Sequence, residues 1–205
     1  MKILAINGSH RVDQNTDILI DIALDAARQA GAETEVIELA ECNIEFCAGC
    51  NRCLFKPECS IKDDDMRVIK EKMLAADGIL IASPNYFSNV TARMKNFFDR
   101  TRPLHMTSNQ LKGKVAGFLT MGGLDNTGSE TTNAIMENFC ATHEMLIVHA
   151  RPEGPVLGSG VTGSLLDRVE DGIPHWRRSV KDDPIAPLIA AQLGKDMVEL
   201  IKRLS

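Results

Sequence analysis

The stretch KILAINGSHRVDQNTDILIDIALDAARQAG, residues 2–31, decides the fold. Residues 2–7 form a short apolar run that ends at Asn7, which is typical of a buried β-strand. Residues 15–31 repeat apolar side chains at helical spacing, and Gly31 stands where a helix commonly ends. The apolar helical positions are Ile18, Leu19, Ile22 and Ala26. A strand that leads through a polar turn into an amphipathic helix predicts the first unit of a parallel α/β sheet.

The same alternation continues along the chain. Further strands are predicted at residues 33–39, 78–82, 115–121 and 145–149. Further helices are predicted at residues 64–76, 90–102, 129–142 and 185–204. Five strands that alternate with helices predict one α/β domain over residues 1–205, with a doubly wound five-stranded parallel sheet in the order 2-1-3-4-5.

Two segments interrupt this pattern. A cysteine-rich insertion at residues 42–62 follows the second strand, and residues 151–184 are rich in Pro and Gly and precede the last helix. The second segment is predicted to be an irregular arm. Gly158 to Gly163 formally match GxGxxG, but prolines rather than a strand precede them, which argues against a dinucleotide loop there.

Composition excludes several classes of function. The 205 residues carry a net charge of −5 and only 4% aromatic side chains, so neither a basic face nor a base-stacking platform for nucleic acid is expected. The longest apolar runs are too short to cross a membrane or to act as a secretory signal. We therefore expect a cytoplasmic protein that binds neither nucleic acid nor membrane.

Three unusual loops follow the first, third and fourth predicted strands, where ligands of doubly wound sheets bind. The first runs from Gly8 into the next helix and offers hydroxyl, amide and guanidinium groups beside a helix N-terminus, from Ser9, Arg11, Asn15 and Thr16. Together they could cradle a phosphate. The alternative is an ordinary N-capped turn, since Ser, Asn and Thr are common caps.

The other two loops suggest a flat ligand. The second contains Pro84, Asn85, Tyr86 and Phe87, which offer apolar faces and backbone hydrogen bonds. The third begins at Met121, Gly122 and Gly123, where glycine permits close approach of a ligand to the backbone. Taken singly, the aromatic pair could simply cap the core, and the glycines could form a flexible turn.

The most specific motif is the run Cys47-Ala-Gly-Cys50-Asn-Arg-Cys53-Leu-Phe-Lys-Pro-Glu-Cys59. Four of the six cysteines fall within thirteen residues, a compact spacing used by iron–sulfur proteins. Structural zinc usually takes two CxxC knuckles separated by a longer loop, so zinc is the weaker alternative. Cys42 and Cys140 lie outside the run and are expected to be ordinary small residues.

With these motifs the chain resembles the iron–sulfur flavoprotein branch of the NADPH-dependent FMN reductase family, over roughly residues 1–150. The marks are the first loop, the cysteine run, Ser83 to Tyr86, Met94 to Arg100, and Gly122 with Gly123. His10 departs from the family, in which proline is common there, and so does the long segment 151–184.

The resemblance implies a flavodoxin-like fold, FMN, a 4Fe–4S cluster held by Cys47, Cys50, Cys53 and Cys59, and a homodimer or homotetramer. It places the phosphate on Ser9, Arg11, Asn15 and Thr16. The ribityl chain and the isoalloxazine ring would lie on Pro84, Asn85, Tyr86 and the Gly122–Gly123 backbone, with Phe87 and Met121 beside them. It names no catalytic acid or base.

Three functions remain open at this point. The first is an oxidoreductase that passes electrons from a ferredoxin-like carrier through cluster and flavin to a small-molecule acceptor. The second is an NAD(P)H-dependent FMN or quinone reductase, with NAD(P)H as a substrate, and the third is a non-enzymatic redox carrier or sensor. The basic residues Arg52, Lys56 and Lys62 near the cysteines predict either a docking patch for an acidic donor or a merely solvated loop.

Overall fold

The computed structural model describes residues 1–150, 152 and 160–205. Its centre is a parallel sheet in the order β2-β1-β3-β4-β5, as the alternation of strands and helices predicts. The strands are β1 (Lys2–Asn7), β2 (Glu33–Glu38), β3 (Gly78–Pro84), β4 (Val115–Gly122) and β5 (Leu146–Ile147). Every residue of β3 and β4 is buried, because helices cover both faces of the sheet.

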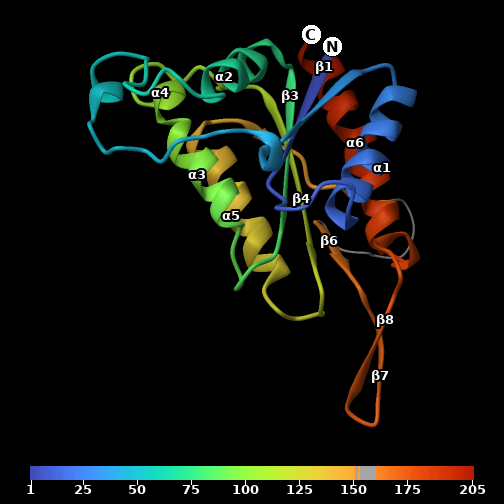
Figure 1. Ribbon diagram of the computed structural model, residues 1–205. Helices are drawn as coiled ribbons and strands as arrows, with labels where there is room; N and C mark the ends of the chain where they lie inside the picture. The colour runs from blue at the N-terminus through green and yellow to red at the C-terminus, as the bar shows by residue number, and fades with distance from the viewer. Residues whose placement is uncertain (151, 153–159) are drawn as a thin grey trace.

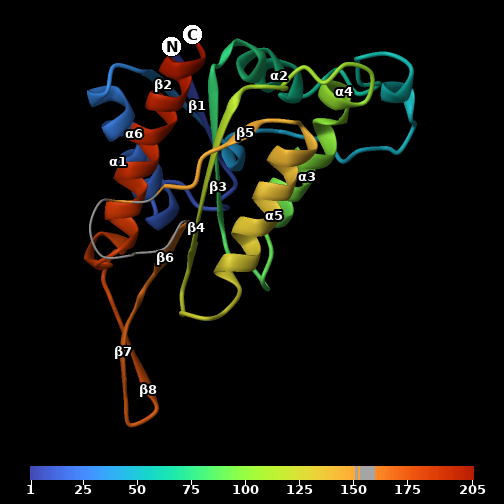
Figure 2. The ribbon, with the colours of Figure 1, turned by 180° about the vertical axis from the view of Figure 1, so that it is seen from behind.

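Figures 1 and 2 show the two helical layers. The helices α1 (Asn15–Gln29) and α6 (Ala186–Leu204) cover one face. On the other face lie α2 (Met66–Ala75), α3 (Ala92–Arg100), α4 (Arg102–His105) and α5 (Ser129–Thr142). The first layer is packed so closely that a Cβ atom on Gly194 of α6 would stand 1.9 Å from the Ala23 carbonyl oxygen of α1. Within the described residues, no helix has the length and apolar character needed to cross a membrane.

The fifth strand position differs from the prediction. It is shared by two short strands along one edge of β4. β5 pairs with the start of β4, at Val115 and Ala116, and β6 (Val161–Ser164) pairs with its end, from Leu119 to Gly122. The sheet therefore has six strands. Pro152 follows the first of these strands and has no N–H group to donate to a ladder, which is consistent with the break.

The prediction of an irregular arm at residues 151–184 is wrong for much of its described part. Besides β6, that part contains the antiparallel hairpin of β7 (Leu166–Glu170) and β8 (Ile173–Trp176) and the 3-10 turn η3 (Val180–Asp182). The hairpin projects from the body of the molecule (Figure 1) and exposes Val169, Ile173 and Trp176. Its strands escaped prediction because little of them is buried, so no alternating apolar pattern marks them. Residues 151 and 153–159 of the predicted arm lie outside the described residues.

The cysteine-rich segment stands where it was predicted, between β2 and α2. The 3-10 turn η1 (Leu39–Glu41) directly precedes it, and within it the structure has one further 3-10 turn, η2 (Arg52–Leu54). In Figure 1 it forms the far end of the α2, α3 and α4 side, away from the loops at the carboxyl ends of the strands.

Candidate functional site

The loop after β1 is held in one conformation by its own side chains. Asn7 Oδ1 accepts a hydrogen bond from Ser9 N at 2.9 Å. Ser9 Oγ accepts one from Arg11 N at 3.0 Å and donates one to Arg11 O at 2.7 Å. Thr16 is buried in the first turn of α1, whereas Arg11 is exposed. The loop thus offers a fixed turn, a free guanidinium group and the N-terminus of a helix, which together suit an anion.

A pair of carboxyl groups lies under this loop. Asn7 Nδ2 donates to Asp17 Oδ1 at 2.9 Å and to Glu38 Oε2 at 2.8 Å. Burial, and then the nearby Asp17 carboxylate, raise the pKa of Glu38 to about 8. At neutral pH Glu38 therefore holds a proton, which keeps a second negative charge away from the loop.

Asn85 joins the second loop to the third. Its backbone N donates to Met121 O at 2.8 Å. Its side-chain Nδ2 donates to Thr127 O at 2.9 Å, while Oδ1 accepts from Thr132 Oγ1 at 2.9 Å. The predicted ligand residue Asn85 is therefore engaged in holding two loops together, through the partners Thr127 and Thr132 that the sequence pattern did not single out.

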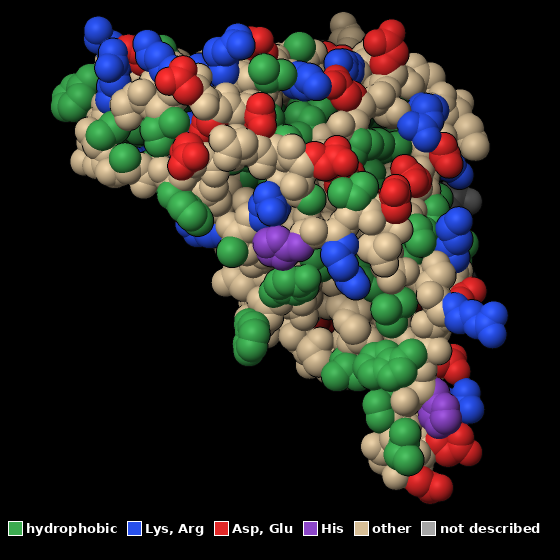
Figure 3. Space-filling view, viewed as in Figure 1, with side chains coloured by type: hydrophobic (Ala, Val, Ile, Leu, Met, Phe, Trp, Pro, Cys, Tyr) green, Lys and Arg blue, Asp and Glu red, His purple; other side chains and the backbone are tan. Residues whose placement is uncertain are grey.

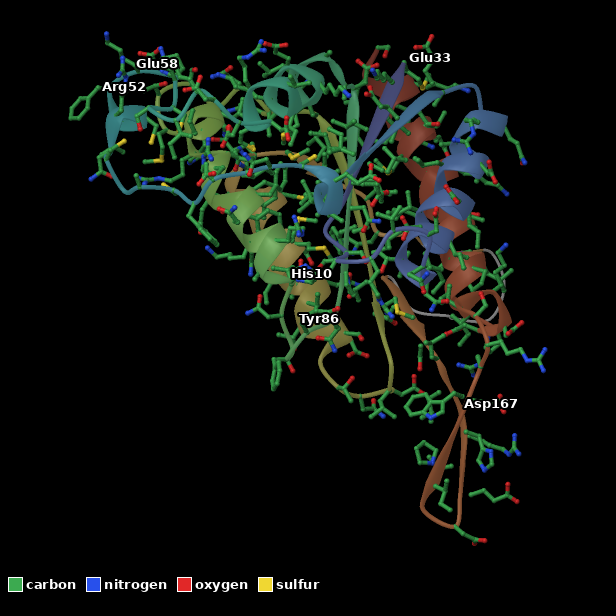
Figure 4. The ribbon with its side chains drawn as sticks, in the orientation of Figure 1. His10, Glu33, Arg52, Glu58, Tyr86 and Asp167 are labelled. Atoms are coloured by element: carbon green, nitrogen blue, oxygen red, sulfur yellow. The ribbon has the colours of Figure 1, made fainter. Side chains whose placement is uncertain are left out.

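The aromatic residues of the second loop behave differently from one another. Tyr86 pairs with Asn89 around a two-residue turn whose central residues, Phe87 and Ser88, both have positive φ. Phe87 is fully exposed at 106%, so it does not cap the core. The Tyr86 ring stacks on the ring of His10 with centroids 5.7 Å apart, and Figure 4 shows the two side by side. This stack connects the second loop to the first.

The third loop passes close to both neighbours. Gly128 has φ of +98°, and a Cβ atom there would lie 2.1 Å from Ser88 Oγ, so only glycine fits. A Cβ on Gly123 would come within 4.0 Å of the Trp176 ring, which reaches across from β8. Trp176 is thus a neighbour of the predicted flavin loops that the sequence analysis missed.

The structure therefore gathers the predicted flavin residues at one edge of the sheet, with two exceptions in detail. Asn15 Oδ1 accepts a hydrogen bond from Val180 N at 2.9 Å, so its oxygen serves the contact with η3. Phe87 stands out into solvent. Pro84 and Met121 are buried and lie opposite each other in the ladder between β3 and β4.

The four cysteines of the run from Cys47 to Cys59 lie around one small cavity. Cys47, Cys50, Cys53 and Cys59 line a space of about 20 Å³, and all four are free thiols. A hydrogen-bond contact of 3.0 Å with Ser60 Oγ lowers the pKa of the Cys50 thiol. Four thiols of this kind are the donor set that an iron–sulfur cluster requires. Across residues 1–150, 152 and 160–205, however, no three His, Cys, Asp or Glu side chains are close enough together to hold one metal ion.

The cysteine segment is anchored by α3 rather than by its own backbone. Arg100 forms a buried ion pair with Asp64 at 2.5 Å and donates to Glu45 O at 2.6 Å. Asn96 Nδ2 donates to Ile44 O at 2.8 Å. Burial works against the charge on Arg100, but Asp64, and then the nearby Cys59 thiol, raise the pKa of the guanidinium.

The basic residues near the cysteines are only partly free. Arg52 pairs with Glu58 at 2.8 Å on the surface, as Figure 4 shows, whereas Lys56 and Lys62 are exposed. In Figure 3 Lys and Arg side chains gather over the cysteine segment and α2, interspersed with acidic ones. The predicted docking patch therefore depends mainly on Lys56 and Lys62.

Comparison with known proteins agrees with this geometry. Residues 1–151 match the family described as NADPH-dependent FMN reductase. An iron-sulfur flavoprotein of Methanocaldococcus jannaschii is 38% identical over 202 residues, which are 98% of each of the two chains. An iron-sulfur flavoprotein of Methanosarcina thermophila is 39% identical over 148 residues, 72% of this chain and 77% of its own.

A solved structure shows the fold independently. The flavodoxin, WrbA-like protein from Agrobacterium tumefaciens has a TM-score of 0.58 to this chain at 13% identity, covering 100% of this chain and 98% of its own. The predicted flavodoxin-like sheet is confirmed. The chain belongs to the NADPH-dependent FMN reductase family, in its iron–sulfur flavoprotein branch, and is a flavin-dependent oxidoreductase.

Proposed function

We propose that this chain binds FMN and a 4Fe–4S cluster and passes electrons from a ferredoxin-like one-electron donor, through cluster and flavin, to a small-molecule acceptor. The observation that carries the proposal is the presence of two separate sites in one domain. One is a set of three loops at the switch point of the sheet, and the other is a set of four free cysteines around one cavity. FMN exchanges electrons singly or in pairs and a cubane cluster exchanges them singly, so the two together can join one-electron to two-electron chemistry.

In this proposal the phosphate of FMN is held by the first loop. Ser9 keeps the turn closed, Arg11 supplies the counter-charge, and Thr16 lies at the helix N-terminus. Asn15 has only its amide NH₂ group left for the phosphate, because its oxygen accepts from Val180.

The flat ring of FMN would lie against the second and third loops. Tyr86 offers an aromatic face that His10 already supports by stacking. The Gly122 and Gly123 backbone offers hydrogen-bonding groups without side chains in the way. Pro84 and Met121 form the buried base, and Asn85 fixes the relative position of the two loops. Phe87 is free to cover the ring, since nothing holds it in the core.

The cluster would be held by Cys47, Cys50, Cys53 and Cys59. Their thiols fit the group by number and by spacing in the sequence, and they line one cavity, so that binding the cluster requires only that the four side chains move closer together. The Ser60 contact favours the thiolate of Cys50. Zinc remains the alternative metal, and metal analysis separates the two directly.

A second candidate function is an NAD(P)H-dependent FMN or quinone reductase. The family description favours it, because it names NADPH. Nicotinamide can stack on a bound flavin without a dinucleotide loop of its own, so the lack of a GxGxxG loop after a strand does not decide against it. The third possibility, a carrier or sensor without turnover, uses the same two sites.

The assembly that we propose is a cytoplasmic homodimer or homotetramer. The projecting hairpin of β7 and β8 exposes Val169, Ile173 and Trp176, and Trp176 approaches the third loop. A second copy that covers these side chains would also shield the flavin edge from water.

One experiment separates these functions. Protein purified without oxygen is assayed for iron and FMN, and turnover is then measured side by side with NADPH and with reduced ferredoxin. The proposal expects about four irons and one FMN per chain, with faster reduction by ferredoxin. Zinc in place of iron would overturn the cluster, faster turnover with NADPH would favour the second function, and slow reduction by both would leave a carrier or sensor.

A further inference from the structure

Of the two arginines that line the cysteine cavity, Arg100 is the buried one. It ends α3, its side chain is 1% exposed, and it lines the cavity together with the four cysteines. It also lines a second cavity of about 290 Å³, together with Cys59. Arg100 and Cys59 therefore line both cavities.

The three nitrogens of this guanidinium are used unequally. Nη1 donates to Asp64 Oδ2 at 2.5 Å and to Glu45 O at 2.6 Å, and Nη2 is 3.3 Å from Asp64 Oδ1. Nε is buried and has no hydrogen-bond partner. Among the unpartnered buried side-chain atoms of residues 1–150, 152 and 160–205, it alone belongs to a side chain that lines the cysteine cavity.

An unused N–H group on a buried cation is costly unless something accepts its hydrogen. Asp64 pairs with the guanidinium group of Arg100 and balances its charge. The pair restricts rotation of the guanidinium group, so Nε cannot easily turn toward another acceptor. A water molecule is a poor partner, because it needs two to four polar neighbours. The cavity is lined mostly by cysteines and apolar residues such as Ile61 and Pro103. Its other polar residues have partners already: Asp99 pairs with Lys95, Asn51 Oδ1 accepts from Arg102, and Ser60 contacts Cys50. A thiolate of the cysteine set is the acceptor that remains, and Cys59 is the cysteine that lines both cavities with Arg100.

We infer that Nε of Arg100 donates a hydrogen bond to Sγ of Cys59 when the cluster is bound, and that this bond raises the reduction potential of the cluster. The inference rests on the cluster of the proposed function and adds a positioning residue to it. Reduction adds one electron to the cluster and breaks no bond. An N–H group aimed at a ligand sulfur stabilises the more negative reduced state more than the oxidised state.

A charge-conserving substitution tests the role of Nε. Arg100→Lys keeps a cation that can pair with Asp64 but has no Nε. Arg102→Lys is the matched control, because Arg102 lines the same cavity from α4 and uses Nη2 on Asn51 Oδ1 at 3.3 Å. The readout is the midpoint potential of the cluster, followed by electron paramagnetic resonance during an anaerobic redox titration.

We expect Arg100→Lys to keep its iron and to lower the one-electron reduction equilibrium constant about tenfold, which corresponds to a shift of ~59 mV. Arg102→Lys should leave the potential unchanged. Equal potentials in wild type and in iron-loaded Arg100→Lys would overturn the inference and leave the proposed function standing. Wild-type protein without iron would overturn both.

A measurement on the wild type guards against misfolding of the variant. Protein labelled with ¹⁵N only in the guanidinium nitrogens of arginine is reduced, and the nuclear coupling of nitrogen to the cluster spin is recorded, so that the backbone N of Arg52, which contacts Cys50, gives no signal. A ¹⁵N coupling that persists in both Arg52→Lys and Arg102→Lys supports the bond from Arg100. Its absence from the reduced, iron-loaded wild type overturns the inference, whatever the variant does.

Discussion

Two regions of the molecule are held in place by different means. The flavin edge consists of the loops that follow β1, β3 and β4, and the cysteine segment consists of residues 42–62. At the flavin edge each loop continues a buried strand, and neighbouring loops are tied to one another, by the His10–Tyr86 stack and by the bonds of Asn85. Residues 42–62 have almost no regular structure, and side chains of α3 such as Asn96 and Arg100 hold them from outside. The edge is held by contacts among its own loops, whereas the segment depends on side chains of α3.

The two regions nevertheless share one helix. At the start of α3, Thr91 Oγ1 donates to Gly8 O at 2.6 Å and accepts from Met94 N, which joins the helix to the phosphate loop. At its end, Arg100 holds the cysteine segment. With nine residues the helix is ~13 Å long. The difference teaches that a metal would add most to the order of the segment and least to that of the edge.

The largest expected effect comes from removing a metal ligand in the cysteine segment while the flavin edge is left unchanged. Replacing Cys50 by Ala removes one of four ligands, so we expect loss of the iron and faster proteolysis within residues 42–62, while FMN stays bound. Cys42→Ala is the control, because Cys42 lies outside the cavity and is not one of the four ligands. Metal analysis, flavin absorbance and limited proteolysis provide the readouts. Loss of FMN together with iron would show that the two regions are not independent.

The complementary substitution removes the positive charge of Arg11, which faces the phosphate of FMN in the proposed site at the flavin edge. A charge-assisted hydrogen bond is worth ~1.5–3 kcal/mol, so Arg11→Ala should weaken FMN binding roughly 10- to 100-fold. Riboflavin, which lacks the phosphate, should bind wild type and variant equally, and the iron content should not change. Fluorescence titration measures both affinities. An equal loss for the two flavins would assign Arg11 a structural role instead.

The contrast between buried strands and exposed segments also explains which parts of the fold could be predicted from the sequence. Residues 78–82 and 115–121 are apolar runs, and they do form the core of β3 and β4. The hairpin of β7 and β8 carries charges on exposed strands, so the periodicity of apolar residues could not reveal it. One local signal was present, because Asp171 and Gly172 occupy its turn with positive φ, the usual chemistry of a two-residue hairpin turn.

The sites divide in the same way. The loop residues Ser9, Asn85 and Gly122 could be found because the ends of parallel strands must meet at one edge. Arg100 belongs to the stretch Met94 to Arg100 that marks the family resemblance, but its contact with the cysteine segment could not be predicted, since its partner Asp64 lies 36 residues away. Contacts of that kind depend on how elements pack, and no short stretch of sequence encodes them.

A smaller effect tests whether ties between loops organise the flavin edge. Asn85→Ala removes the hydrogen bonds to Thr127 O and from Thr132 Oγ1. At ~1 kcal/mol for each bond, the third loop should loosen and FMN should bind about tenfold more weakly. Asn138→Ala, on the exposed side of α5, is the control. Hydrogen exchange of residues 122–128 should rise only in the first variant. Unchanged exchange there would mean that the loops are organised without Asn85.

The smallest effect concerns the carboxyl pair beneath the edge, and its sign follows from the raised pKa of Glu38. Because folding raises that pKa from 4.5 to about 8, the folded state binds the extra proton between these values, and stability falls as pH rises through this window. Glu38→Gln cannot lose a proton, so its advantage over wild type should be absent below pH 4.5 and complete above pH 8. Glu38 is half-buried, and solvent screening reduces the gain to about 1 kcal/mol. That gain corresponds to a rise in Tm of ~2–4 °C at pH 9 and none at pH 4, which thermal unfolding at these two pH values can resolve. A gain of equal size at pH 4 and pH 9 would mean that folding does not raise the pKa of Glu38. Glu38 and Asp17 would then both carry a negative charge at neutral pH.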